Sequence, residues 1–177
     1  MNRFNFALAA AMAAMAGPAL ADTVVAHMAL TTPTGPGAPV GEITISDAPG
    51  GVSFTLNLHG LPAGPHGFHV HVNPSCAATV NPQTNAPVPA GGAGGHLDPA
   101  MTNMHMGPEG MGHMGDLPVL VVDADQTAHQ TLKAPHIASV AELKGHSLMI
   151  HVGGDNYADK PLPLGGGGAR LACGVIG

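Results

Sequence analysis

The sequence predicts an all-β protein, an antiparallel sandwich or barrel of about eight short strands with two long loops. Apolar and polar residues alternate with a period of two in several segments, which is typical of half-buried strands. The 177 residues include 26 glycines and 17 prolines, and many of these lie in turns between the segments. Only residues 138–144 suggest a helix, of one or two turns. Many short strands with turns between them favour a sandwich or barrel.

The strands follow from the alternation in chain order. One side of the first segment carries the apolar residues Val24, Ala26, Met28 and Leu30. A later segment alternates polar residues with Val52, Phe54, Leu56 and Leu58. Further strands are expected at residues 40–46, 67–72, 119–123, 128–132, 147–152 and 171–176.

Two segments without strand character, 73–117 and 153–168, are much longer than the usual connection of ~4–6 residues. The first contains three histidines and Asp116, and the second contains Asp155 and leads to Arg170. Both are therefore expected to be functional loops. The glycines at 165–168 fit either a flexible linker or a loop folded tightly over a site.

The N-terminus predicts export. Arg3 is followed by an apolar run at 4–15 and by the small-residue sequence Ala-Leu-Ala at 19–21, the pattern of a secretory signal peptide. Cleavage after Ala21 would leave residues 22–177 as one domain, placed in the periplasm. No later stretch reaches the ~20 apolar residues of a transmembrane helix, so no membrane partner is expected after cleavage.

Charge and cysteine content narrow the function further. Without Arg3, four basic and eleven acidic residues remain, a formal charge of −7 that argues against a nucleic-acid partner. In an exported chain, an isolated pair of cysteines such as Cys76 and Cys173 favours a disulfide over a metal site. The chain-entropy model assigns such a loop about 4–5 kcal/mol of stabilisation.

Twelve histidines point to metal binding. His69 and His71 stand two residues apart on a predicted strand, so both side chains project from the same face. Alone, this pair fits metal ligands or two ordinary polar residues. Three imidazoles and a carboxylate within the first long loop form a set that tetrahedral zinc accepts: His96, His105, His113 and Asp116. Imidazole also suits copper, and His151 offers a further ligand. The alternative is that these residues never converge.

Several motifs together resemble the bacterial exported copper-zinc superoxide dismutases over essentially the whole mature chain. They are GPHGFHVH at 64–71, GGHLDP at 94–99, GPEG at 107–110, HMGD at 113–116, HVGGDN at 151–156 and GARLACGVIG at 168–177. The resemblance implies an eight-stranded Greek-key barrel of immunoglobulin-like form. It also implies an oxidoreductase that converts superoxide to oxygen and hydrogen peroxide, with one copper and one zinc per subunit.

The resemblance implies a role for each matching position. Copper would be held by His69, His71, His96 and His151. Zinc would be held by His96, His105, His113 and Asp116. His96 would therefore bridge the metals and carry a proton, and Asp155 would hydrogen-bond His69 and His105 from outside the ligand set. Arg170 would attract the superoxide anion, and Cys76 would pair with Cys173. Lys160 fits either substrate guidance or an ordinary solvated lysine.

Other histidines are expected outside the site. His66 matches a structural position near the barrel end, and no role falls to His27, His59, His129, His136 and His146. Five methionines crowd around His105 and His113: Met101, Met104, Met106, Met111 and Met114. They suit either a copper-uptake surface or flexible filling of an irregular loop, and we favour filling.

Rival functions remain at this level. A copper-binding or chaperone module of the same fold would lack dismutation, yet no ligand position is replaced. A zinc hydrolase needs an open coordination position, which a four-ligand zinc set closes. An adhesive sandwich leaves the histidine arrangement unexplained. Both a monomer and a homodimer are compatible with the sequence.

Overall fold

The computed structural model describes residues 22–177, almost entirely as β-strands and loops. Its strands are β1 Thr23–Thr32, β2 Gly35–Ala48, β3 Gly51–His59, β4 Gly64–His66, β5 Phe68–His71, β6 Thr79–Val80, β7 Pro87–Val88, β8 Leu120–Val122, β9 Thr127–Ala128, β10 Thr131–Ala134, β11 Ser147–His151 and β12 Arg170–Val175. Three 3-10 turns lie at Gly91–Ala93, Val140–Glu142 and Leu164–Gly166. The predicted signal peptide and its cleavage after Ala21 lie outside the described residues. Within that part of the chain, no helix is long and apolar enough to cross a bilayer.

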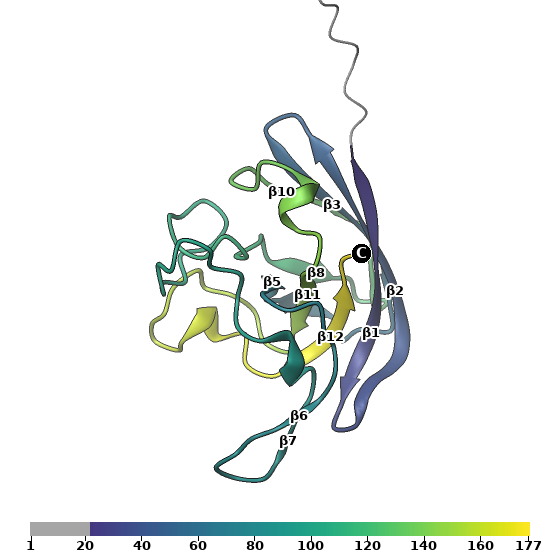
Figure 1. Cartoon of the computed structure of the whole chain (residues 1–177). Helices are drawn as coiled ribbons and strands as arrows, with labels where there is room; N and C mark the ends of the chain where they lie inside the picture. Colours follow the sequence, from purple (N-terminus) through teal and green to yellow (C-terminus); the bar gives the residue numbers. More distant parts are fainter. Residues whose placement is uncertain (1–21) are drawn as a thin grey trace, which may run out of the picture.

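The strands form a curled antiparallel sheet with the order β10-β3-β2-β1-β12-β11-β5, and β9 also pairs with β3. The last strand, β12, lies between β1 and β11, so the two ends of the domain meet in the sheet. β4 and β8 form a separate antiparallel pair. After β8 the chain turns into β9, which pairs with β3. The long strands β1, β2 and β3 form one side of the molecule, and the loops extend from the other side (Figure 1).

Apolar alternation places the core inside this curled sheet. Ala26 and Met28 of β1 and Phe54, Leu56 and Leu58 of β3 are all buried, as the period-two pattern predicts. Phe54 packs edge-on against Phe68 of β5, with ring centroids 5.7 Å apart. Fully burying one such side chain contributes about 1.5–3 kcal/mol, so this core fixes the position of β5.

The structure corrects three details of the predicted elements. Residues 128–132 form no single strand, because β9 ends at Ala128 and β10 begins at Thr131. The helix expected at 138–144 is only the 3-10 turn Val140–Glu142. The loop 73–117 contains a small hairpin of β6 and β7, two strands too short for a periodic pattern.

A disulfide ties the first long loop to the sheet. Cys76, near the start of this loop, is bonded to Cys173 of β12, which confirms the predicted pairing. The same strand begins at Arg170. The bond therefore links the loop that carries three histidines to the strand that carries the arginine.

Candidate metal centre

Strand β5 supplies the centre of the site. His69 and His71 alternate with the core residues Phe68 and Val70, and all four side chains are buried. β11 runs alongside β5, with Met149 opposite His69 and Ser147 opposite His71. The regular pleat thus places both imidazoles on one face.

Two loop segments add to the edge of β5. Isolated antiparallel bridges pair His69 with Asp116 and His71 with His96. Val70 sits between them: its N–H donates to Gly115 O (2.9 Å), and its carbonyl accepts from Leu97 N (2.8 Å). A methyl group on Gly115 would lie 2.3 Å from the Val70 carbonyl oxygen, so only glycine permits this approach. Backbone hydrogen bonds therefore bring residues distant in sequence beside the β5 pair.

One group of buried imidazoles contains His69, His71, His96 and His151, with one ring nitrogen of each within 4.8 Å of the others. In three of these rings the other nitrogen donates a hydrogen bond. His69 Nε2 donates to Asp155 Oδ2 (2.7 Å), His71 Nδ1 to Gly94 O (2.8 Å) and His151 Nδ1 to Gly168 O (3.1 Å). Each bond fixes the tautomer and leaves the inward nitrogen with a free lone pair.

A second group surrounds Asp116. Its Oδ1 atom lies 2.9 Å from Nδ1 of both His96 and His105 and 3.3 Å from Nδ1 of His113. Its Oδ2 atom accepts a hydrogen bond from Met106 N (3.1 Å). The carboxylate and three ring nitrogens therefore face one point.

His96 belongs to both groups. Its Nδ1 faces Asp116, while its Nε2 is buried without a hydrogen-bond partner beside the rings of the first group. The His96 ring stacks on that of His69 with a centroid distance of 4.0 Å. His69 also lies near His96, His105 and Asp116, but its Nε2 is bonded to Asp155, so only Nδ1 is free.

The unpartnered nitrogens test whether metals fit. Within residues 22–177, five buried ring nitrogens have no hydrogen-bond partner: His69 Nδ1, His71 Nε2, His96 Nε2, His105 Nδ1 and His151 Nε2. A buried polar atom without a partner costs about 1–3 kcal/mol. Five such atoms aimed into two adjacent points form the donor set that imidazole-binding metals such as copper and zinc accept.

Comparisons with known proteins agree with this chemistry. A family model described as Copper/zinc superoxide dismutase (SODC) matches residues 40–176. The chain belongs to the copper/zinc superoxide dismutase family. It is 56% identical over 169 residues to the copper-zinc superoxide dismutase of Brucella abortus, covering 96% of each chain. It is 48% identical to the Escherichia coli K12 protein, covering 99% of each.

Solved structures extend the match to the fold. The Brucella abortus copper/zinc superoxide dismutase superposes with a TM-score of 0.86 at 56% identity, covering 88% of this chain and 100% of that one. The monomeric Salmonella enterica enzyme superposes with a TM-score of 0.78 at 50% identity, with coverages of 89% and 100%. The Greek-key β-barrel predicted from the sequence is confirmed. The protein is a superoxide dismutase that uses copper and zinc and converts superoxide to oxygen and hydrogen peroxide.

Burial and neighbouring carboxylates shift the pKa values of the histidines of this superoxide dismutase in opposite directions. Burial away from water lowers the pKa of His69 to about 3 and that of His151 to about 4, and it also lowers the pKa of His71 and His96. Burial acts in the same direction on His105, but the carboxylates of Asp116 and Asp155 outweigh it and raise its pKa to about 9. The metal-free site therefore holds neutral rings around His69 and a cationic ring at His105 near neutral pH.

Asp155 joins the two groups from outside. Its Oδ2 accepts from His69 Nε2 and its Oδ1 from His105 Nε2, both at 2.7 Å. Burial opposes the ionised form, yet the bonds from His105 and His69 keep the pKa of Asp155 well below its usual range. A methyl group on Gly165 would lie 1.8 Å from Asp155 Oδ1, so the glycine loop closes directly over this carboxylate.

Arg170 lies at the start of β12, opposite His151 of β11. Its guanidinium is half-buried and donates to the carbonyl oxygens of Ala90 and Gly94. The carbonyl oxygen of Gly94 also accepts a hydrogen bond from His71 Nδ1. Arg170 and the His71 ring therefore share one acceptor. A hollow of about 290 Å³ adjoins Arg170.

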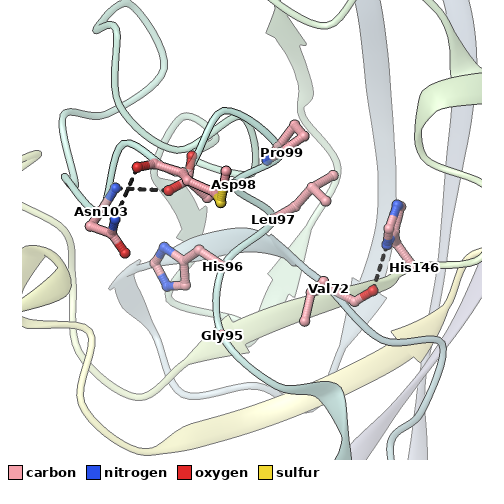
Figure 2. A pocket seen from close by; sticks show the side chains of 9 residues that line it. Val72, Gly95, His96, Leu97, Asp98, Pro99, Asn103 and His146 are labelled. Atoms are coloured by element: carbon pink, nitrogen blue, oxygen red, sulfur yellow. Dashed lines mark hydrogen bonds between the residues drawn. The ribbon is translucent and has the colours of Figure 1, made fainter.

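Another hollow, of about 440 Å³, is lined by His96 and Leu97 among other residues (Figure 2). Figure 2 shows the side chains of His96 and Leu97 on opposite sides of the chain, with Asn103 bonded to Asp98 and His146 bonded to Val72. The imidazole of His96 faces Asp116, and Leu97 is buried in the core.

The remaining histidines lie where the sequence suggested. His66 is buried and bonded to the carbonyls of His151 (2.7 Å) and Pro62 (2.8 Å). Three others are exposed, namely His27, His59 and His129. Two bond to carbonyls of residues that follow a proposed ligand: His136 Nε2 donates to Met114 O (2.9 Å), and His146 Nδ1 donates to Val72 O (2.7 Å). Lys160 is exposed within the second long loop.

The sequence reasoning missed two residues that hold the loops together. Asp159 accepts hydrogen bonds from His105 N (3.0 Å) and Leu164 N (3.3 Å). Tyr157 packs its ring on Gly107, and its hydroxyl accepts from Val119 N (2.9 Å). Tyr157 is the only tyrosine of the chain, and this was the one signal that could have drawn attention to it.

Proposed function

We propose that the first group binds copper and the second binds zinc. The copper ligands are His69, His71, His96 and His151. The zinc ligands are His96, His105, His113 and Asp116. One observation carries this assignment: the two nitrogens of His96 face different groups, Nδ1 toward Asp116 and Nε2 toward the unpartnered nitrogens around His69.

When bound, the two metals would supply different chemistry: copper would exchange an electron with superoxide, and zinc, which has no redox chemistry, would hold its ligands in place. The residues of the chain provide the rest. His96 is the proposed proton carrier, because its Nε2 is buried, has no hydrogen-bond partner among residues 22–177 and can hold a proton. Asp155 keeps the rings of His69 and His105 oriented by accepting from both Nε2 atoms.

Arg170 is the proposed anion-binding residue. The domain carries a formal charge of −7, so a small anion needs a local positive charge near the site. The guanidinium is held beside His71 by two backbone carbonyls, which keeps its charge in one place. Lys160, exposed on the neighbouring loop, is a second proposed source of attraction at longer range.

We further propose that residues 1–21 are removed on export and that residues 22–177 act in the periplasm. The leader pattern around Arg3 and Ala21 supports this, and so does the disulfide between Cys76 and Cys173, which needs an oxidising compartment to persist. All proposed ligands come from one chain, so the site is complete in a monomer. The relative from Salmonella enterica is monomeric.

Metal analysis of residues 22–177 tests these assignments. We expect one copper and one zinc per chain, together with rapid consumption of superoxide. His71→Ala should remove copper and keep zinc, and His113→Ala should remove zinc and keep copper. His129→Ala, which changes an exposed histidine outside both groups, is the matched control and should keep both metals. Loss of both metals in either single variant, or of neither, would contradict the proposed division of ligands.

A copper-binding module without dismutase activity is the rival of this assignment. It would bind copper at the same residues but would not need a cation at Arg170. Retention of full turnover in Arg170→Ala, with copper bound, would weaken the role proposed for Arg170, whereas absent turnover in the unchanged protein would favour the rival.

A further inference from the structure

Four methionines of the first long loop are exposed. Their exposed fractions are 79% for Met101, 48% for Met104, 45% for Met106 and 88% for Met111. The other methionines of residues 22–177 are buried or packed against the core: Met28, Met114 and Met149. A filler must occupy a gap, so the filler interpretation suits Met114 and is wrong for the four exposed residues.

The backbone brings three of these methionines onto two adjacent segments of the loop that carries the proposed zinc ligand His105. Met104 and Met106 flank His105, whose ring is buried while both neighbours are exposed. His113 N donates to Met104 O (3.0 Å), which holds the segment of Met111 against them. Methyl groups on Gly110 and Gly112 would lie 2.4 Å and 3.0 Å from Met106 Cβ. The two glycines thus let the backbone on either side of Met111 approach the Met104–Met106 segment, while the Met111 side chain stays exposed.

Met101 connects this surface to the site. It lines the hollow of about 440 Å³ that His96 also lines. His96 is the residue whose nitrogens face both metal groups. The exposed methionines therefore lie on the solvent side of the loop whose inner side holds the proposed ligands.

Thioether chemistry explains why methionine stands here. Full burial of one methionine side chain would stabilise the fold by about 1.5–3 kcal/mol, and the exposed methionines do not gain this free energy. A loop of polar residues would not lose it. Thioether sulfur is a soft, uncharged ligand that prefers Cu(I) and needs no deprotonation. Glu109, exposed between Met106 and Met111, adds a negative charge that favours a cation.

We propose that Met101, Met104, Met106 and Met111 form a second copper site, a thioether surface that captures Cu(I) before it reaches the four-histidine group. The copper stays Cu(I) throughout, so no oxidant or reductant takes part. Binding at the surface does not depend on the proposed copper ligands. Only delivery to the four-histidine group rests on that assignment.

Anaerobic competition with the Cu(I) chelator bicinchoninate tests binding. The protein carries its full copper and zinc, and its copper is first reduced to Cu(I). Any further Cu(I) must therefore bind outside the two proposed metal sites. We expect at least one additional Cu(I) equivalent, with sulfur in its X-ray absorption spectrum. The variant with Met101, Met104, Met106 and Met111 all changed to Leu should lose it, and Met114→Leu should keep it. The double variant Met106→Leu/Met111→Leu, with fewer changes, should weaken binding at least tenfold.

Copper uptake tests delivery separately. Copper-free, zinc-loaded protein is mixed with the Cu(I)–bicinchoninate complex, and loss of the colour of the complex gives the rate. We expect uptake several-fold slower in the fourfold Leu variant, with the same final copper content. No additional Cu(I) in the unchanged protein, or equal binding by the fourfold variant, would overturn the surface site. Lost binding with an unchanged uptake rate would overturn its role in capture.

Discussion

The two sides of the metal centre are built in different ways. The proposed copper side takes three of its histidines from regular strands, His69 and His71 from β5 and His151 from β11. The proposed zinc side takes all its residues from one irregular loop. Sheet register and the buried core hold the first set, whereas hydrogen bonds, glycines and a disulfide hold the second.

This difference predicts that the two sides fail separately. A strand position moves only if the sheet moves, which the core opposes. A loop position depends on a few contacts, such as those of Asp155 and Asp159 with His105. Changes in the loops should therefore release zinc first and leave the β5 pair in place.

A change of pH should distinguish the copper side from the zinc side most strongly, through the free energy of unfolding of the metal-free protein. Burial lowers the pKa of His69 to about 3 and of His151 to about 4, so the unfolded chain binds more protons than the folded one between pH 6.5 and about 4. The free energy of unfolding should then fall by roughly 1.4 kcal/mol per residue and pH unit as the pH drops through this window.

His105 should act in the opposite direction. Its raised pKa stabilises the fold fully below pH 6.5 and loses this effect as the pH rises toward about 9. Urea unfolding of the metal-free protein should therefore show greatest stability near pH 6.5. Stability that rises steadily from pH 6.5 to pH 4 would contradict the burial of neutral rings on the copper side.

Removal of the disulfide should be the next largest effect. Changing both Cys76 and Cys173 to Ser should cost about 2–5 kcal/mol of unfolding free energy, since the bond closes a loop of 97 residues. Because this bond anchors the zinc-binding loop to β12, zinc should dissociate faster while copper on β5 is retained longer. Metal release measured with and without reductant checks this order, and equal release of both metals would count against it.

Gly165→Ala should weaken the zinc side by a smaller amount. The new methyl group would lie 1.8 Å from Asp155 Oδ1 and 2.8 Å from His105 Nε2, so the carboxylate must move off the ring. Loss of such a supporting contact lowers metal affinity by about 10- to 100-fold.

Gly166→Ala is the matched control for that change. Gly165 and Gly166 both have positive φ, 70° and 81°, so both substitutions share the backbone strain. A methyl group on Gly166 meets only Leu162, at 3.6 Å, and does not touch Asp155. Zinc titration should show weaker binding in the Gly165 variant alone, and equal weakening in both would assign the effect to strain.

Among these changes, Arg170→Ala should lower the free energy of unfolding least, and it should lower the rate of superoxide consumption measurably. Loss of the local positive charge should lower kcat/KM for superoxide by about tenfold and reduce its dependence on ionic strength. Metal content should stay unchanged. Lys133→Ala, which removes an exposed cation on β10, is the control and should keep both kcat/KM and its salt dependence. If both variants behave alike, net charge accounts for the attraction and Arg170 has no special part.

Patterns local in sequence predicted much of the fold. The alternation around Phe54 and in β1 located strands, because a strand shows its two faces within a few residues. The boundaries at Ala128 and Thr131 and the β6–β7 hairpin were missed, because pairing rather than local pattern ends or forms such short strands. Tyr157 and Asp159 were missed for a related reason, since their partners lie about 40 to 55 residues away.

By itself, the sequence determined which chemistry the protein carries. It named the imidazoles and the carboxylate, paired Cys76 with Cys173 through the family motifs, and put His69 and His71 on one face by strand period. Only the tertiary structure decided that the nitrogens of His96 face different groups and that the methionines around His105 lie in solvent rather than in a gap. Both depend on how residues distant in the chain pack together, and a residue's type fixes its donors but not its neighbours.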